Sequence, residues 1–226
     1  MRGFEDLIGE AATADVTGWD FGWLRGRASE ERPPWAYQRM LARRLPGAES
    51  ALDLDTGGGE VLAGVEVVQV PQGAPLPFAG GEFDLVTSRH PVDPAWDEIA
   101  RVLAPGGTYL AQHVGPASAF ELIEFFTGPL PRQRLARDPR AETSAARAAG
   151  LRVDQARLVR LKMEFFDVGA VVWILRRCVW WVPDFDVERY RQRLVAMDAH
   201  IRERGSFVAH STRTLIEARR ERPRGQ

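Results

Sequence analysis

The chain has 226 residues, of which 45% are hydrophobic and 27% are charged, and its formal net charge is −1. This composition is sufficient for one sizeable core and excludes a largely disordered chain. The near-zero charge argues against a general electrostatic binder of nucleic acid. A single cysteine, Cys178, excludes an internal disulfide and a cysteine-based metal site, so we expect no resident metal.

The first residues, MRGFEDLIGEAA, carry three acidic side chains within ten positions and have no long apolar core, which does not match a signal peptide. The longest apolar run, 168–175, is far shorter than the ~20 residues that a membrane span needs. We therefore expect a soluble, cytoplasmic protein without a membrane partner. The oligomeric state is left open by the sequence.

Helical and strand patterns alternate along most of the chain. In chain order they predict a helix at 3–15, a helix at 35–45 introduced by residues 29–34, strands at 51–55, 65–70 and 83–88, a helix at 94–103, a strand at 108–114, a helix at 117–126, a loop at 129–140, a helix at 142–149, a strand at 153–165, helices at 168–181 and 187–204, and a strand at 207–219. Such alternation is typical of an α/β fold whose mostly parallel sheet has helices on both faces. We expect one domain, 1–226, with a helical N-terminal segment 1–47 and a helical cap at 166–205.

One stretch has the pattern of a nucleoside-binding turn. The predicted strand 51–55 ends in acidic residues and runs into the glycine turn Thr56-Gly57-Gly58-Gly59. Two further motifs follow, LPFAGGEFDLV at 76–86 and LAPGGTYL at 103–110.

These three motifs, in this order over about residues 48–165, resemble the class I S-adenosylmethionine (SAM)-dependent methyltransferases, in the branch called methyltransferase type 11. The resemblance implies a Rossmann-like sheet of seven strands, the last one antiparallel, and SAM as cofactor. It also implies that one set of residues binds SAM, namely Asp53, Asp55, Thr56, Gly57, Gly58, Gly59 and Gln72. Of these, Asp55 stands where the family usually has a glycine, and plain turn chemistry is the alternative reading of both aspartates.

The sequence departs from the family after the glycine turn. The family has a helix, a second strand with a ribose-binding acidic residue, and another helix before its third strand. Here only Glu60 to Gly64 separate the turn from 65–70, which resembles the third strand. A parallel crossover needs a dozen or more residues, so we expect the second strand to be missing and SAM binding to be weakened. Pro71 also replaces a frequent family aspartate, and Gln72 or nearby backbone is the expected substitute.

Two further segments lie where ligands are expected, beyond the carboxyl ends of parallel strands. After the strand at 83–88, Arg89 is expected to hold a carboxylate or phosphate, and His90 to act as a base or to orient the acceptor. Gln112 and His113 end the next strand. The alternative is that both histidines only hydrogen-bond loop backbone, while His200 is expected to be solvated and His210 structural.

Four functions come into question for this sequence. The first is SAM-dependent methyl transfer to a small molecule, and the second is a non-catalytic methyltransferase-like remnant or binding protein. An RNA methyltransferase is disfavoured by the near-neutral charge, although arginines concentrate at 132–140. A nicotinamide dehydrogenase is disfavoured because the spacing and acidic residue of a dinucleotide fingerprint are missing.

Overall fold

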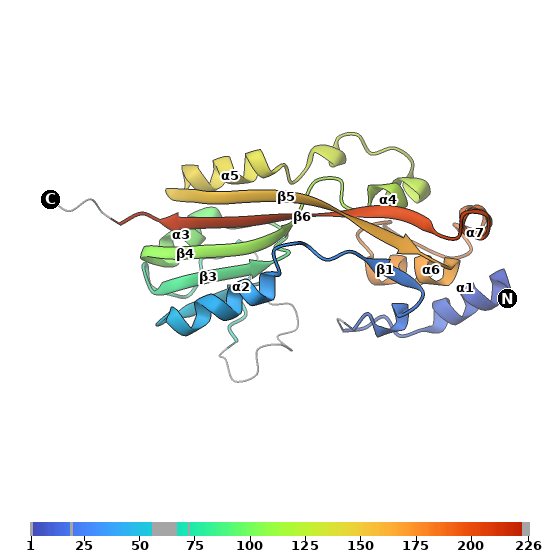
Figure 1. The fold of residues 1–226 in the computed structure, drawn as a ribbon, viewed down its shortest axis with the longest axis horizontal. Coiled ribbons are helices and arrows are strands. Elements are labelled where there is room, and N and C mark those ends of the chain that lie inside the picture. Colours follow the sequence, from blue (N-terminus) through green and yellow to red (C-terminus); the bar gives the residue numbers. More distant parts are fainter. Residues whose placement is uncertain (1, 19, 56–66, 72, 223–226) are drawn as a thin grey trace. The chain divides into compact units, whose positions relative to one another are not determined.

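A computed structural model describes residues 2–18, 20–55, 67–71 and 73–222 (Figure 1). The described residues form an α/β fold on a six-stranded mixed sheet with strand order β1-β5-β6-β4-β3-β2. Its strands are β1 Ala28–Glu30, β2 Ala51–Leu54, β3 Phe83–Arg89, β4 Leu103–Val114, β5 Leu151–Phe165 and β6 Phe207–Arg220. Its helices are α1 Phe4–Thr13, α2 Tyr37–Arg44, α3 Trp96–Val102, α4 Phe120–Thr127, α5 Pro139–Ala148, α6 Val168–Arg177 and α7 Arg191–Arg204.

The strand directions confirm the predicted sheet. β2 is parallel to β3, and β3 is parallel to β4. The last strand, β6, is antiparallel to β4, as the resemblance implied, and β1 is antiparallel to β5. The register places Asp53 beside Thr87 and Arg89 beside Gln112. The carboxyl ends of β2, β3 and β4 therefore meet at one edge of the sheet, which we call the carboxyl edge.

The chain folds into two compact units. The first unit comprises Met1–Arg32, Ala117–Leu135 and Arg160–Ser211, and the second comprises Pro33–Pro116, Ala136–Val159 and Thr212–Gln226. Because β5 and β6 are long, each contributes residues to both units.

In the second unit, helices cover both faces of the sheet. Trp35 and Tyr37, at the start of α2, pack with Leu85, Leu110 and Leu215 of the strands. The opposite face packs against α3 and α5, with Ile99 and Ala146 among the buried residues. Both faces of β3 and β4 are therefore largely covered, as is typical of parallel strands inside an α/β sheet.

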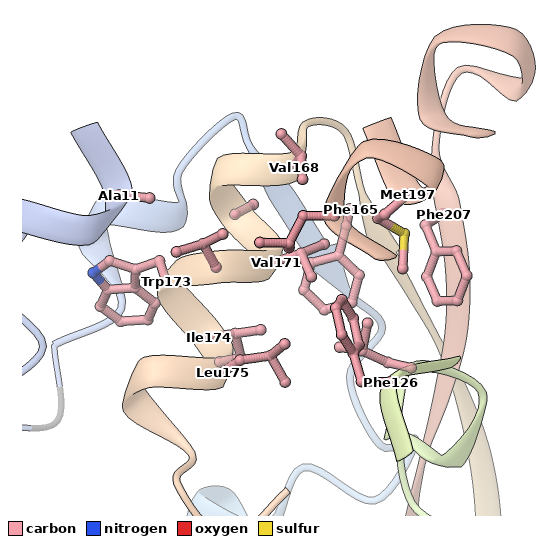
Figure 2. Close-up of a cluster of buried hydrophobic side chains, with 14 of the residues drawn as sticks. Ala11, Phe126, Phe165, Val168, Val171, Trp173, Ile174, Leu175, Met197 and Phe207 are labelled. Carbon is pink, nitrogen blue, oxygen red and sulfur yellow. The ribbon is translucent and has the colours of Figure 1, made fainter. Parts of the chain in front are cut away.

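The first unit has its core around α6, whose residues from Val168 to Leu175 are all buried. Asp167 caps the helix by accepting a hydrogen bond from the Ala170 amide at 2.9 Å. Figure 2 shows Trp173 and Ala11 on one side of α6, and Phe165, Phe126 and Phe207 on the other. A helix that is apolar on every face is expected to be buried on all sides, as α6 is. The helix predicted at 168–181 is therefore confirmed, but it ends earlier, at Arg177.

The strand predicted at 65–70 is wrong for its described part. Residues 67–70 form no strand, nor do the other described residues between β2 and β3, while Val65 and Glu66 lie outside the described residues. Val67 is 65% exposed and Val68 is 42% exposed. A parallel strand within such a sheet needs both faces buried, and these two valines have no such cover.

Two helix boundaries also differ from prediction. Residues 28–30 form β1 rather than a helix start, because the Glu31 amide donates to the Lys162 carbonyl at 2.9 Å and extends the pairing with β5. The loop predicted at 129–140 ends early, since α5 begins at Pro139. There, Asp138 accepts from the Arg140 amide at 2.9 Å and proline occupies the first turn, a start signal that the sequence contained.

Candidate functional site

The LPF motif at 76–78 is held against α3 by two charged side chains. The Leu76 amide donates to Glu98 Oε2 at 2.6 Å, and Arg101 donates to the carbonyls of Phe78 at 2.7 Å and Leu76 at 3.0 Å. The hydrogen bond from Arg101 lowers the pKa of Glu98 to about 2. This motif therefore has a structural role, in positioning the segment that leads into β3.

At the carboxyl edge, Asp53 lies half-buried on β2 and accepts a hydrogen bond from the hydroxyl of Thr87 on β3. Burial raises the pKa of Asp53 above its usual value, and the negative charge of Asp55 raises it further, while the Thr87 hydrogen bond works in the opposite direction. Asp55 is exposed and has φ of 57°, a left-handed conformation that aspartate tolerates better than most residues. The end of β2 thus holds two carboxylates that repel each other, one of them partly removed from water.

Tyr37 joins the ends of the next two strands. Its hydroxyl lies 3.0 Å from the Ser88 carbonyl oxygen and 3.1 Å from that of Leu110, so its single proton is shared by two backbone acceptors. Burial raises the pKa of Tyr37, and the charge of Asp53 adds to that effect. Tyr37 is therefore a neutral donor that fixes the spacing of β3 and β4 below the carboxyl edge.

A chain of side-chain hydrogen bonds reaches His90. Trp35 Nε1 donates to Gln112 Oε1 at 2.9 Å, and Gln112 Nε2 lies 3.1 Å from His90 Nε2. Because the indole can only donate, the carbonyl of the Gln112 amide must face it, and the NH₂ group must face His90. His90 Nε2 is then an acceptor, which leaves the imidazole proton on Nδ1. No hydrogen bond to His90 Nδ1 is found among the described residues.

His90 is held neutral. Burial lowers its pKa to about 3, and the next largest causes are the positive charges of Arg213 and Arg89. The backbone is also constrained, with φ of 61° and the amide donating to the Gln112 carbonyl at 2.8 Å. An imidazole of such low pKa is a weak proton acceptor near neutral pH, whereas its Nδ1–H remains a hydrogen-bond donor.

His113 differs from His90 because both of its ring nitrogens are engaged. Nε2 lies 3.1 Å from the Tyr109 hydroxyl, and Nδ1 lies 3.0 Å from Glu142 Oε2. The side chain is 1% exposed and packs beside the Trp96 ring. Tyr109 is fully buried, which raises the pKa of its phenol. This network ties β4 to α5 and has no ring nitrogen left for a ligand.

The remaining histidines are not at the carboxyl edge. His200 is exposed on α7, as predicted. His210, on β6 in the first unit, lies 3.0 Å from Glu121 Oε1 and 2.8 Å from Arg160 Nη2. Within the described ranges, no group of three or more His, Cys, Asp or Glu side chains could hold a metal ion. No helix in those ranges is both long and apolar enough to cross a membrane.

The structure brings four sequence-predicted site residues to the carboxyl edge of the second unit: Asp53, Asp55, Arg89 and His90. The other predicted residues, Thr56, Gly57, Gly58, Gly59 and Gln72, lie outside the described residues. Tyr37 and the contact of Trp35 with Gln112 were not foreseen. Their partners are distant in sequence, 77 positions for Trp35 and Gln112, so no local pattern signals them.

Comparison with known proteins finds similar folds among solved structures. No protein-family model and no curated protein matches the sequence. Among solved structures, the chain is similar to BH2331 of Bacillus halodurans C-125, a candidate methyltransferase, with 16% identity and a TM-score of 0.50 over 80% of this chain and 98% of that one. It is also similar to YcgJ of Bacillus subtilis, with 16% identity and a TM-score of 0.47 over 82% and 100% of the two chains. The Trm112-bound methyltransferase candidate of Haloferax volcanii has 18% identity and a TM-score of 0.42 over 96% and 98%.

The last two TM-scores are below 0.5. The likeness to BH2331 agrees with the motifs and the sheet topology. The chain has the class I SAM-dependent methyltransferase fold.

Proposed function

We propose that the chain binds SAM at the carboxyl edge of its second unit and transfers the methyl group to a small-molecule acceptor. The observation that carries the proposal is the pair of carboxylates, Asp53 and Asp55, at the end of β2 in a chain with this fold. Open α/β sheets bind ligands beyond the carboxyl ends of their strands, and this pair lies there.

The charges at the end of β2 suit a cationic ligand. SAM carries a sulfonium and an ammonium group, and a positive charge near Asp53 and Asp55 offsets the repulsion between the two carboxylates. Thr56 to Gly59 follow Asp55 directly in the chain, and by resemblance they complete the same site, with Gln72 toward adenine. The ribose-binding carboxylate of the family has no counterpart in the sequence, so we expect weakened affinity.

When bound, SAM supplies an activated methyl group and its own leaving group, so the protein must provide alignment and a dry site. Thr87 holds the Asp53 carboxylate in place on the neighbouring strand. Tyr37 fixes the ends of β3 and β4, and Gln112 fixes the ring of His90. We assign His90 the orientation of the acceptor through Nδ1–H, because its low pKa makes it a poor base.

Isothermal titration of the full chain with SAM, and with S-adenosylhomocysteine, tests this proposal. We expect one saturable site for each, a raised unfolding temperature on binding, and loss of SAM binding in Asp53→Asn. The matched control is Asp93→Asn, which removes the same charge from an exposed loop residue. Absence of heat and of any unfolding shift at millimolar SAM would support the alternative, a non-catalytic protein that retains the methyltransferase fold.

A further inference from the structure

Basic groups gather at the carboxyl edge from β3, the neighbour of β2, across to β6. Arg89 ends β3 beside Gln112, and Arg213 on β6 pairs in register with Val114 at the end of β4. Arg137 precedes α5, and Arg157 lies with its guanidinium 5.8 Å from the centre of the Trp35 ring. All of these residues belong to the second unit.

Arg89 has the features of a ligand-binding cation. It is exposed, and among the described residues it forms no ion pair, although other arginines of the unit do. Arg44 pairs with Glu217 at 2.6 Å, and Arg219 pairs with Asp154 at 2.9 Å. The next residue, His90, presents a neutral imidazole with its proton on Nδ1, because Gln112 occupies Nε2. Two adjacent donors, one charged and one neutral, suit an oxyanion.

The charges of the site are also segregated. The carboxylates of Asp53 and Asp55 lie at the end of β2, whereas Arg89 lies at the end of β3 and Arg213 lies midway along β6, opposite the end of β4. A cationic cofactor is attracted to the first group and repelled by the second. An amine acceptor would be repelled from the basic side, whereas an anionic acceptor is attracted to it and kept apart from the carboxylates.

From this arrangement we infer that the methyl acceptor is an anionic small molecule whose carboxylate or phosphate is held by Arg89 and by Nδ1–H of His90. The inference rests on the proposed function, since it names the acceptor class of that same site. In this inference Arg89 recognises the anionic group of the acceptor. Gln112 and Trp35 are positioning residues, because they keep the imidazole proton of His90 on Nδ1, where it can be donated to that group.

Titration of the full chain, labelled with ¹⁵N-histidine, with inorganic phosphate and separately with acetate tests the inference. Ionic strength is held constant with sodium chloride, and the His90 Nδ1 resonance is followed. We expect a saturable shift with at least one of the two anions, and the tighter one assigns phosphate or carboxylate chemistry. Arg89→Gln should weaken binding about tenfold, the usual effect of losing one charge-assisted hydrogen bond.

The control is Arg147→Gln, which removes an equal charge from the exposed last turn of α5 and should leave anion binding unchanged. Arg89→Lys keeps the charge but loses the planar fork, and should weaken binding less than Arg89→Gln does. If neither anion gives a saturable shift, or if Arg89→Gln and Arg147→Gln behave alike, the inference is wrong. SAM binding measured on the same protein separates the two proposals. SAM binding without anion binding overturns only the inference. Anion binding without SAM binding overturns the proposed function and the role of the anion as methyl acceptor, and leaves only an anion site at Arg89 and His90.

Discussion

The side-chain amide of Gln112 and the imidazole of His90 are joined by a hydrogen bond of 3.1 Å between their Nε2 atoms, and the direction of this bond is set by Trp35. A donor-only indole in the core thus decides which nitrogen of a half-buried histidine carries the proton. The consequence reaches the carboxyl edge, where His90 becomes a hydrogen-bond donor rather than a base.

Trp35→Phe removes the indole N–H and keeps an aromatic ring. We expect Gln112 Oε1 to lose its partner, at a cost of about 1–3 kcal/mol in the free energy of unfolding, because a buried carbonyl is left unsatisfied. The His90 ring should then sample both tautomers, which ¹⁵N chemical shifts of the imidazole detect. Trp96→Phe is the control, since no hydrogen bond from Trp96 Nε1 is found in the described residues. Unchanged His90 shifts in Trp35→Phe would contradict the account.

His90 should make the fold sensitive to acid. Its pKa is lowered to about 3 in the folded state against an ordinary 6.5, by burial and by the charges of Arg213, Arg89, His113 and Arg137. Between these two pH values the unfolded chain binds a proton that the folded chain does not, so stability falls as pH is lowered from about 6.5. The contribution reaches up to about 2 kcal/mol at pH 5.

Chemical denaturation at pH 7.5 and pH 5 measures this effect. His90→Asn, which tolerates the left-handed backbone, should lose less stability on acidification than the natural chain does. His200→Asn, at an exposed position on α7, should behave like the natural chain. An equal acid loss in His90→Asn and the natural chain would show that His90 titrates normally.

Thr87→Val keeps the shape of the side chain but removes the hydroxyl that donates to Asp53. We expect a loss of about 1–3 kcal/mol at pH 7, since a partly buried carboxylate loses its hydrogen bond, and a further rise in the Asp53 pKa. Thr87→Ser keeps the donor and should recover most of the loss. Urea denaturation at pH 7 compares the three proteins, and a valine variant as stable as the natural chain would show that the hydrogen bond to Asp53 contributes nothing.

The parts of the fold that could be predicted have local signals. The apolar strands around Leu85 and Leu110 and the buried run of α6 follow from composition and periodicity, whereas the antiparallel direction of β6 was implied by the family resemblance. The carboxyl edge was also predictable, because parallel strands bring Asp53 and His90 to the same edge. The strand predicted at 65–70 was wrong over its described part, 67–70, because alternation and β-branched residues indicate a strand only where neighbouring elements can bury it.

The hydrogen-bonded framework of the site was not predictable. The contact of Trp35 with Gln112 depends on how the segment that leads into α2 packs on the sheet. Tyr37 gave no signal, because its acceptors are backbone carbonyls of β3 and β4. The hydrogen bond between His113 and Glu142 was also not predictable. Glu142 lies on α5, and only the tertiary fold brings it close to His113.

Asp53→Asn should separate stability from function. The substitution removes a carboxylate whose pKa is raised by burial and by Asp55, and the amide oxygen can still accept from Thr87. We expect the ligand-free protein to be unchanged or more stable by about 1 kcal/mol at pH 7, while SAM binding is lost. Thermal unfolding with and without SAM measures both effects. A clear destabilisation of the ligand-free protein would show that Asp53 is a structural residue.

The first unit offers a test of its own core. Trp173 is 1% exposed, stacks on Trp23 at 5.9 Å between ring centres, and donates from Nε1 to the Asp15 carbonyl at 3.0 Å. Trp173→Ala should cost about 3–5 kcal/mol. Trp180→Ala, at a side chain that is 63% exposed, should change stability by less than about 0.5 kcal/mol. Similar losses in the two variants, measured by denaturation, would contradict the packing shown in Figure 2.

The central claim is that the paired carboxylates at the end of β2 hold a cationic nucleoside cofactor. Calorimetric titration of the full chain with SAM tests it most directly, with Asp53→Asn and Asp93→Asn measured in parallel. The account predicts one saturable site that is retained in Asp93→Asn and lost in Asp53→Asn. No binding to the natural chain, or equal binding to all three proteins, would contradict it.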